Sequence, residues 1–347
     1  MQIKFWPQDL KLAHTWTIAS SVTSGSDVTS VGIVQLTDRD GTVGLGEAAP
    51  ARRYNESTPG SLDFIAKVDA TKLSFDNIEA SMKYVESLAS GQFAAKSAIN
   101  VALLDGAARK AGKPIYDLLG LGFRNNHHVT SFSIGIDKAD VIRKKVLAAE
   151  QYPVLKLKVG AADDKANLAA LREAAPQKWV RVDANEGWKT KEHALEMIEW
   201  LAQDKFIQYI EQPMPADSNP KDIAWLKARS PLPLFGDESY HTAKDVDHCA
   251  ECYHGVNVKL CKTGGISNAY EALQVARKAG LKTMIGCMIE TSILISAAAH
   301  LAELCDYLDI DGNLLTTNDP YLGVTAEKGL LSFASAPEKL GLRVRAK

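Results

Sequence analysis

The sequence predicts an α/β fold: a (β/α)8 barrel of the TIM type that follows a smaller α+β domain. From about residue 128 onward, short apolar runs alternate with amphipathic helical stretches. Five of these runs end on an ionisable residue, and the five residues are 25, 28, 26 and 22 positions apart, about one strand-plus-helix unit. Barrels of this kind carry their chemistry at the carboxyl ends of the strands. The five residues are Lys158, Asp183, Glu211, Asp237 and Lys259.

Residues 1 to about 120 are expected to form the α+β domain. MQIKFWP alternates apolar and polar residues, VTSVGIVQL is rich in β-branched residues, and GTVGLGEA follows the turn DRDG, which is a hairpin signal. After residue 60, apolar residues recur at i, i+3 and i+4 with Gly and Pro at the segment ends, which predicts helices. Strands followed by helices are typical of an α+β domain rather than of half a barrel.

The barrel is expected over residues 121–319, with strands separated by helices such as KANLAALREAA and KEHALEMIEWLAQ. No full helix follows the eighth strand, which makes the barrel a modified one. The tail LGLRVRAK is expected to return to the first domain, so residues 320–347 are assigned there. The eight expected strands are VTSFSIG, PVLKLKV, WVRVDA, FIQYIEQ, LPLFGDE, GVNVKL, KTMIGCM and YLDIDG.

The composition of this chain of 347 residues, 46% hydrophobic and 24% charged, is that of an ordinary soluble globular protein. With a net charge of −2, the chain lacks the excess of positive charge that is typical of proteins that bind nucleic acid or an anionic membrane surface. No window is apolar enough for a membrane span, and the first residues lack the apolar core of a signal peptide, so we expect a cytoplasmic protein. The cysteines number five, an odd count that argues against a disulfide framework.

Cys249 and Cys252 form a CxxC pair with His248 and His254 beside it. One interpretation is a zinc site, although no second pair of ligands follows at suitable spacing. The other interpretation is one packed face of the helix expected after Asp237, since residues three apart lie on the same side of a helix.

Three acidic residues end three successive expected strands: Asp183 in WVRVD, Glu211 in IQYIE and Asp237 in PLPLFGD. Each alone would be an ordinary residue at a strand end. Together they bring three carboxylates to the same end of the barrel, where they repel each other strongly unless a cation lies between them. A ligand set of oxygen atoms favours Mg²⁺. The three acids are therefore predicted to bind Mg²⁺.

Lysines flank these acids. Lys156 and Lys158 are two residues apart on one strand, so both point to one face, where crowding is expected to lower the pKa of each amine toward that of a useful base. An exposed edge strand with solvated lysines is the alternative. Lys259 ends the sixth strand, almost opposite in the ring, which suits removal of a proton from one face of a carbon and its return to the other. Lys262 is the alternative candidate for the role of Lys259 in proton transfer, but it lies beyond the strand.

Asp309 and Asp311 stand two apart in YLDIDG at the eighth strand, and therefore on one face. Two acids there would suit an ammonium group on a ligand, and the alternative is an ordinary acidic turn before Gly312. The Gly264–Gly265 pair also allows two interpretations, a turn that binds phosphate or a tight turn at a helix start.

The chain resembles the enolase superfamily, in particular its muconate-lactonizing-enzyme subgroup, over essentially its whole length. The DID of Asp309–Asp311 resembles the D-x-D signature of dipeptide epimerases, in which the two acids hold the α-ammonium group of the dipeptide. The other segments that carry the resemblance are KLK of Lys156–Lys158, DANEGW from Asp183, EQP from Glu211, DES from Asp237 and KLCKTGGI from Lys259.

The resemblance implies that the α+β domain caps the barrel, that Lys158 and Lys259 are the two acid/base catalysts, and that Lys156 stabilises an enolate. The implied activity is that of an isomerase, a 1,1-proton transfer at the α-carbon of the C-terminal residue of a dipeptide. The residues implied to bind Mg²⁺ are Asp183, Glu211 and Asp237.

L-Ala-D/L-Glu is the substrate expected from the resemblance, which would place the enzyme in cytoplasmic recycling of cell-wall peptides. Alanyl-glutamate epimerases of the family carry an arginine in the first capping loop, whereas TWTIASSVTSGSD has no basic residue. Arg52 and Arg53, in AAPARRYNES, are the candidates to bind the glutamate side chain instead. An epimerase of hydrophobic or other dipeptides stays an alternative.

o-Succinylbenzoate synthase and muconate cycloisomerase share these lysines and acids within the resemblance, but neither substrate has an ammonium group for Asp309 and Asp311 to bind. A non-catalytic, metal-dependent protein that binds small molecules is the alternative from a different class. In each case the expected partner is a small molecule and not nucleic acid or a membrane, and a homo-oligomer is left open.

Overall fold

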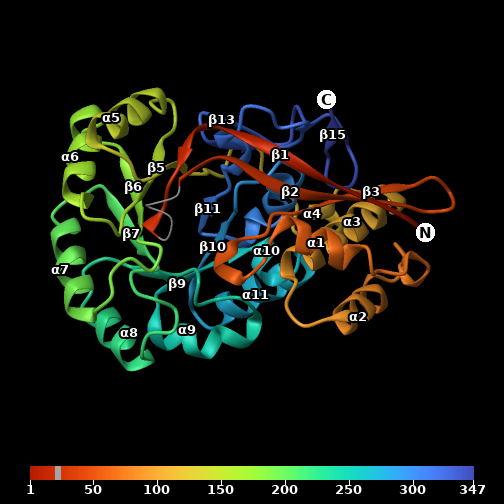
Figure 1. The fold of residues 1–347 in the computed structure, drawn as a ribbon, viewed down its shortest axis with the longest axis horizontal. Helices are drawn as coiled ribbons and strands as arrows, with labels where there is room; N and C mark the ends of the chain where they lie inside the picture. The colour runs from red at the N-terminus through yellow and green to blue at the C-terminus, as the bar shows by residue number, and fades with distance from the viewer. Residues whose placement is uncertain (20–24) are drawn as a thin grey trace.

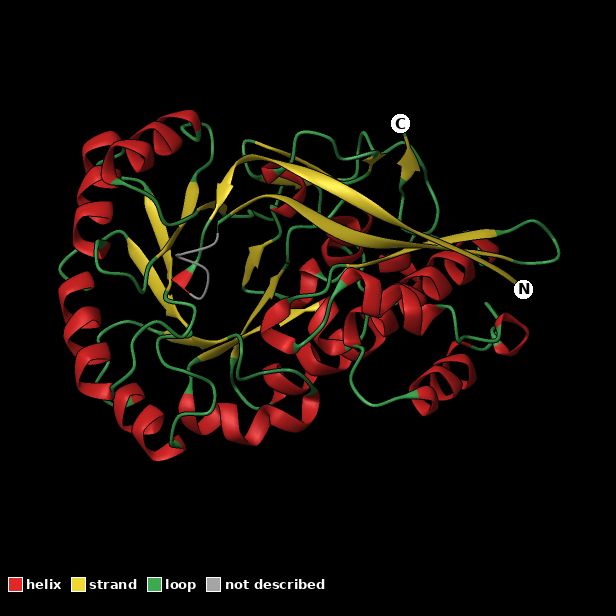
Figure 2. Cartoon of the chain, in the orientation of Figure 1, coloured by secondary structure: helices red, strands yellow, loops and turns green. Residues whose placement is uncertain are grey.

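The computed structural model describes residues 1–19 and 25–347 of the chain (Figure 1). A curved sheet of long strands, with helices packed against it, stands beside a ring of shorter strands that is surrounded by helices (Figure 2). Both chain ends lie on the side of the long-stranded sheet. The fold predicted from the sequence, a modified (β/α)8 barrel with an α+β domain, is confirmed.

The first part is an antiparallel sheet in the order β1–β2–β3, with helices on one face. The buried helix α3 packs directly on β3 because Gly44 and Gly46 let the two backbones meet: a Cβ atom at Gly44 would lie 2.0 Å from the carbonyl oxygen of Ala102. The strands are β1 (Gln2–Trp16), β2 (Ser26–Thr37) and β3 (Val43–Ala48), and the helices are η2 (Arg52–Tyr54), α1 (Thr58–Ile65), η3 (Ala70–Lys72), α2 (Ile78–Leu88), α3 (Phe93–Lys110) and α4 (Ile115–Leu118).

The second part is a sheet of eight parallel strands in sequential order. Thr130, just before the first of these strands, bridges in parallel to Leu308 on the last, which closes the ring. The strands are β4 (Phe132–Ile134), β5 (Val154–Lys158), β6 (Trp179–Asp183), β7 (Ile207–Glu211), β8 (Leu234–Gly236), β9 (Gly255–Lys259), β10 (Lys282–Gly286) and β11 (Tyr307–Asp309).

Helices cover the outside of the ring, so the strands are buried on both faces, as parallel strands usually are. The side chains of Thr190 and Asn219 cap two of these helices, α7 and α8, and the second begins with a proline. The helices are α5 (Ala139–Ala148), α6 (Asp164–Ala174), α7 (Lys191–Leu201), α8 (Pro220–Lys227), η4 (Ala243–Asp245), α9 (Val246–Cys252), α10 (Leu260–Thr263), α11 (Ile266–Lys278), α12 (Ser292–Ala299), η5 (Ala302–Leu304) and η6 (Gly312–Leu315).

The tail after the barrel packs back on the first part. Gly341 exchanges backbone hydrogen bonds with Lys113 and Ile115, and the N–H of Leu342 donates to the buried carboxylate of Asp105 at 2.8 Å. These contacts support our proposal that residues 1–120 and 320–347 form one domain and residues 121–319 the other. The short strands of the tail are β12 (Tyr321–Leu322), β13 (Thr325–Glu327), β14 (Leu330–Ser332) and β15 (Arg345–Ala346).

The structure also bears on two motifs with open interpretations. Cys249 and Cys252 are buried on α9, where the first donates to a backbone carbonyl oxygen of Ser239, which agrees with a packed helix face. Gly264 ends α10 at φ 91°, and Gly265 packs so closely on Asn100 that a Cβ atom would lie 2.5 Å from its side-chain oxygen, which explains a tight turn. Over the described ranges, no helix has the length and apolar character needed to cross a membrane.

Candidate functional site

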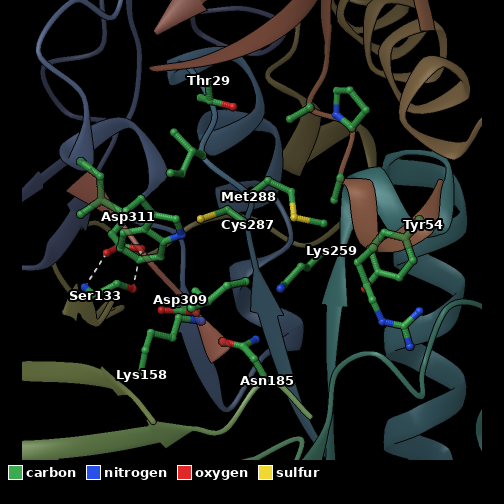
Figure 3. Close-up of a pocket in the computed structure, with 18 of the residues that line it drawn as sticks. Thr29, Tyr54, Ser133, Lys158, Asn185, Lys259, Cys287, Met288, Asp309 and Asp311 are labelled. Atoms are coloured by element: carbon green, nitrogen blue, oxygen red, sulfur yellow. Dashed lines mark hydrogen bonds between the residues drawn. The ribbon is translucent and has the colours of Figure 1, made fainter. Parts of the chain in front are cut away.

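Two of the five ionisable residues at the strand ends, Lys158 and Lys259, line a cavity of about 220 Å³ at the carboxyl end of the barrel (Figure 3). The first domain supplies the rest of the cavity wall, so the site lies between the two parts of the chain. The barrel contributes Ser133, Lys158, Asn185, Glu186, Glu238, Lys259, Asp309 and Asp311, and the first domain contributes Trp16, Ile18, Thr29, Val31, Arg53 and Tyr54.

Three carboxylates lie together beside the two lysines that line this cavity, and none of the three is on its wall. Asp183 and Glu211 end β6 and β7 and are partners in the parallel register, and Asp237 comes directly after β8. All three are fully buried. Burial, with the charge of Asp183, raises the pKa of Glu211 to about 7. Burial acts in the same direction on Asp183, but Lys158 and Lys156 together outweigh it and lower the pKa of that carboxyl.

Lys156 lies at the centre of the acidic cluster. Its ammonium nitrogen is 2.5 Å from Asp309 Oδ2, 2.8 Å from Glu211 Oε2 and 3.1 Å from Asp183 Oδ2. The expectation that crowding lowers the pKa of this lysine is wrong. Burial does act in that direction, but the three surrounding carboxylates outweigh it and raise the pKa of Lys156 well above its ordinary value.

Lys158 and Lys259 both reach the cavity wall, from opposite sides of the ring. They end β5 and β9, which are separated by three strands of an eight-stranded ring. Lys158 Nζ lies 2.6 Å from Asp183 Oδ2, and Lys259 Nζ lies 2.7 Å from Asp237 Oδ2. Each amine is therefore bound to one of the buried acids and faces the cavity.

Lys262, the rival of Lys259 in the sequence, does not line the cavity. It is on α10, fully buried, and donates to the carboxylate and the backbone oxygen of Asp237 as well as to the backbone oxygens of Tyr240 and Asn257. Its partners are all oxygen atoms of the protein, so Lys262 supports Asp237 and does not face a ligand.

Asp309 and Asp311 lie on the cavity wall beside Lys158 (Figure 3). Asp309 accepts from Lys156 and, at 2.7 Å, from the hydroxyl of Ser131, and Lys156 holds its pKa at about 2 against the effect of burial. Asp311 accepts from the backbone N–H of Ser133 at 2.6 Å and from its hydroxyl. Burial, together with Asp309, raises the pKa of Asp311 to about 7.

The two arginines differ in position. Arg53 lines the cavity, but its guanidinium makes two hydrogen bonds to Glu186, at 2.5 and 2.8 Å. Arg52 is exposed and does not line the cavity. The first capping loop contains residues 20–24, which lie outside the described residues, and their sequence, SSVTS, contains no cation.

Several residues of the wall were not predicted from the sequence. Glu238, next to Asp237, is half-buried, and its desolvation together with the charge of Asp237 raises its pKa to about 8. Glu186 and Asn185 both adopt positive φ, 66° and 41°, a conformation uncommon for residues other than glycine and often found at functional sites. The DANEGW and DES motifs contain these residues, so position within a motif was an available signal. No such signal marked Trp16 or Tyr54.

The three acids at the strand ends fit a divalent cation by their chemistry. The atoms that these three side chains offer to a cation are all oxygens, and all three residues are buried. Glu211 Oε2 accepts no hydrogen bond of suitable geometry, although the ammonium group of Lys156 is close. Within residues 1–19 and 25–347 no His, Cys, Asp or Glu side chains surround one centre as metal ligands do. Lysine ammonium groups lie against Asp183, Glu211 and Asp237 instead.

Comparison with known proteins identifies a family for each of the two parts of the chain. Residues 10–120 match the N-terminal domain of the mandelate racemase/muconate lactonizing enzyme family, and residues 140–325 match a domain described as enolase C-terminal domain-like. An L-Ala-D/L-Glu epimerase of Bacteroides thetaiotaomicron is 37% identical over 97% of this chain and 86% of its own. A hydrophobic dipeptide epimerase of Roseobacter litoralis is 35% identical over 97% of both chains.

Two solved structures have the same fold over nearly the full length. The L-Ala-D/L-Glu epimerase of Bacillus subtilis, in a complex with substrate, has a TM-score of 0.91 and 27% identity, and the match covers 100% of this chain and 98% of that one. The dipeptide epimerase of Enterococcus faecalis, complexed with Mg and the dipeptide L-Leu-L-Tyr, has a TM-score of 0.89 and 31% identity, with 99% and 98% coverage.

Proposed function

The chain belongs to the mandelate racemase/muconate lactonizing enzyme family and is an isomerase of the epimerase or racemase type, and we propose that it epimerises dipeptides at the α-carbon of the C-terminal residue. The observation that carries the proposal is the placement of Lys158 and Lys259 at the ends of β5 and β9, on opposite sides of one cavity. A carbon held between two amines can lose a proton to one and gain a proton from the other.

Asp309 and Asp311 are proposed to bind the α-ammonium group of the dipeptide. Asp309 is already paired with Lys156, whereas Asp311 forms no ion pair with the described part of the chain and accepts only from Ser133. A buried carboxylate without a cationic partner is costly, so an ammonium group beside Asp311 would be bound favourably. This pairing supports a dipeptide over the substrates of o-succinylbenzoate synthase or muconate cycloisomerase.

The proton transfer is assigned to Lys158 and Lys259. The amine that acts as the base must be neutral, while the opposite amine is protonated and donates to the other face of the carbon. Lys156, between Asp309 and the acids at the strand ends, is proposed to stabilise the negative charge that develops on the substrate when its α-proton leaves. A non-catalytic binding protein would have no need of two amines on opposite sides of its ligand.

The metal in this proposal is Mg²⁺, to be held by Asp183, Glu211 and Asp237. When bound there, it supplies positive charge next to the carboxylate of the substrate and makes the adjacent α-proton more acidic. The protein contributes three buried carboxylates and the support of Asp237 by Lys262.

For the second residue of the dipeptide we propose glutamate, which would place the enzyme in cytoplasmic recycling of cell-wall peptides. Arg53 is the arginine on the described part of the cavity wall, and a relative with this specificity is 37% identical. Hydrophobic dipeptides are the second candidate, because Glu186 already binds Arg53 and apolar groups contribute much of the wall. Among these groups are Trp16, Val31, Met288, Ile289 and Leu315.

A dipeptide library incubated with the enzyme and Mg²⁺ in D₂O tests the proposal. Each proton transfer replaces the α-hydrogen of the second residue with deuterium, so mass spectrometry should show a gain of one mass unit in the substrates that react. Chiral analysis should show that both epimers form. The proposal is contradicted if no dipeptide exchanges its α-proton, or if N-acetylated dipeptides react as fast as free ones.

A further inference from the structure

We propose that Glu47, in the first domain, is a positioning residue that fixes the loop of residues 287–291 on the cavity wall and so helps to select the second side chain of the substrate. The inference rests on the proposed dipeptide activity and extends it to a residue that lies outside the cavity. The loop joins β10 to α12, and three of its residues line the cavity: Cys287, Met288 and Ile289.

The carboxylate of Glu47 binds the end of this loop directly. Glu47 is on β3 and fully buried, and its Oε1 atom accepts from the backbone N–H of Thr291 at 2.9 Å. Its Oε2 atom accepts from the Thr291 hydroxyl at 2.5 Å and from the N–H of Leu294 at 3.4 Å. Thr291 is the N-cap of α12, so a carboxylate of one domain satisfies the N–H groups at the start of a helix of the other.

The loop is fixed at a second point, against Gly312. A Cβ atom at this position would lie 2.3 Å from the carbonyl oxygen of Met288 and 3.0 Å from the backbone nitrogen of Glu290. Gly312 directly follows Asp311, the proposed ammonium ligand. A shift of the loop would therefore change both the apolar wall of the cavity and the backbone beside Asp311. For this reason the hydrogen bonds of Glu47 to Thr291 should affect substrate choice.

Glu47 also belongs to a segment, residues 47–53, that makes three polar contacts with the barrel, and the contact with Thr291 is the first of them along the chain. Two residues later the N–H of Ala49 donates to Cys261 Sγ at 3.3 Å, and Arg53 then pairs with Glu186. The segment from Glu47 to Arg53 thus contacts the regions that follow β10, β9 and β6, and several of its residues are on the cavity wall. Of these three contacts, the one at Glu47 holds the loop of residues 287–291.

Glu56 provides a matched control. It is also a buried glutamate of the first domain that binds a helix start, since it accepts from the N–H groups of Phe93 at 2.6 Å and Ala94 at 3.1 Å. These residues begin α3, which belongs to the same domain as Glu56. Loss of this carboxylate removes a helix cap of the same chemistry but leaves the loop of residues 287–291 in place.

The experiment compares Glu47→Leu, Glu47→Gln and Glu56→Leu with the wild type on L-Ala-L-Glu and L-Ala-L-Leu. For Glu47→Leu we expect the ratio of the two kcat/KM values to change by about fivefold or more, mainly through KM. Glu47→Gln keeps one carbonyl oxygen for the Thr291 N–H and should restore the ratio to within about twofold of the wild type. Glu56→Leu should lower thermal stability with the ratio unchanged.

The inference is overturned if Glu47→Leu lowers both kcat/KM values equally, or if Glu56→Leu changes the ratio as much. Where Glu47→Leu does not fold, Thr291→Val, which removes the hydroxyl donor from the loop side, replaces it, with Thr291→Ser as the variant expected to retain the ratio. Absence of turnover of any dipeptide by the wild type counts against the proposed function itself. Wild-type turnover with an unchanged ratio in the Glu47 and Thr291 variants counts against the role of Glu47 alone.

Discussion

The ammonium group of Lys262 binds Asp237 twice, once at the backbone carbonyl oxygen and once at the carboxylate. The same carboxylate accepts from Lys259 on its other oxygen, so Asp237 lies between one lysine that faces the cavity and one that does not. The two interactions together hold the pKa of Asp237 well below its ordinary range, although burial acts to raise it. Lys262 therefore supports the orientation and the charge of a proposed metal ligand.

Lys262→Met should destabilise the protein and weaken its affinity for Mg²⁺. Removal of one partner of a buried ion pair commonly costs 3–5 kcal/mol, and about 3 kcal/mol is expected because Asp237 keeps Lys259. Thermal unfolding and titration with Mg²⁺ measure the two effects. Lys144→Met, at an exposed position of α5, is the control that should change neither. A Mg²⁺ affinity equal to that of the wild type would show that Lys262 is not needed to hold Asp237.

Asp183→Asn, Glu211→Gln and Asp237→Asn should each abolish turnover while the fold persists. The physical reason is that each change removes one negative oxygen from the proposed cation site without a change in side-chain size. Circular dichroism checks the fold, and the deuterium exchange assay checks activity. Mg²⁺ at 100 times its Kd should stabilise the wild type by about 2.7 kcal/mol and these variants by much less. Full activity after exhaustive chelation would rule out the metal requirement.

Lys158→Ala and Lys259→Ala should each abolish epimerisation, since one face of the α-carbon then has no proton donor or acceptor. Loss of a general acid or base typically lowers the rate by about 10²–10⁴-fold. We also expect each variant to retain some α-proton exchange with only one of the two epimers, and the two variants to retain it with opposite ones. Separate incubations of the two pure epimers in D₂O measure this. Exchange of the same epimer by both variants would contradict the placement of the amines on opposite faces.

Asp311→Asn should weaken dipeptide turnover severely while Mg²⁺ binding stays intact, because the amide cannot pair with the α-ammonium group. Truncation of one partner of a buried charged pair commonly costs about 2–5 kcal/mol. The kinetics of free and N-acetylated dipeptides, compared between variant and wild type, provide the measurement. Asp140→Asn, at an exposed position on α5, is the control. An equal response of free and acetylated dipeptides would refute ammonium binding at Asp311.

Arg53→Ala should raise KM for L-Ala-L-Glu more than for L-Ala-L-Leu if Arg53 binds the glutamate carboxylate. A charge-assisted hydrogen bond is worth roughly 1.5–3 kcal/mol, so the loss of selectivity should be about ten- to a hundredfold. Glu186→Gln weakens the competing ion pair and should have the opposite effect, a lower KM for L-Ala-L-Glu. Arg52→Ala, at an exposed position away from the cavity wall, is the comparison. A wild type that prefers apolar dipeptides would favour the hydrophobic alternative.

The sequence by itself determined those parts of the site that stand at the ends of the barrel strands, one in each strand-and-helix unit. Each barrel strand is a local apolar run, and parallel strands of one sheet must end at the same edge. The residue at the end of a run is thus placed by its position in the chain. For this reason the spacing of Lys158, Asp183, Glu211, Asp237 and Lys259 along the chain is enough to group them in one site.

Only the tertiary structure decided which residues meet across the two domains. Arg53 and Glu186 are 133 residues apart in the chain, and Glu47 and Thr291 are 244 apart. No periodicity connects positions at such separations, because their contact depends on how the first domain packs on the barrel. The pKa of Lys156 was likewise decided by tertiary structure. The nearest charged residue in the sequence is another lysine, Lys158, but in the barrel carboxylates from three other strands surround Lys156, and they raise its pKa instead of lowering it.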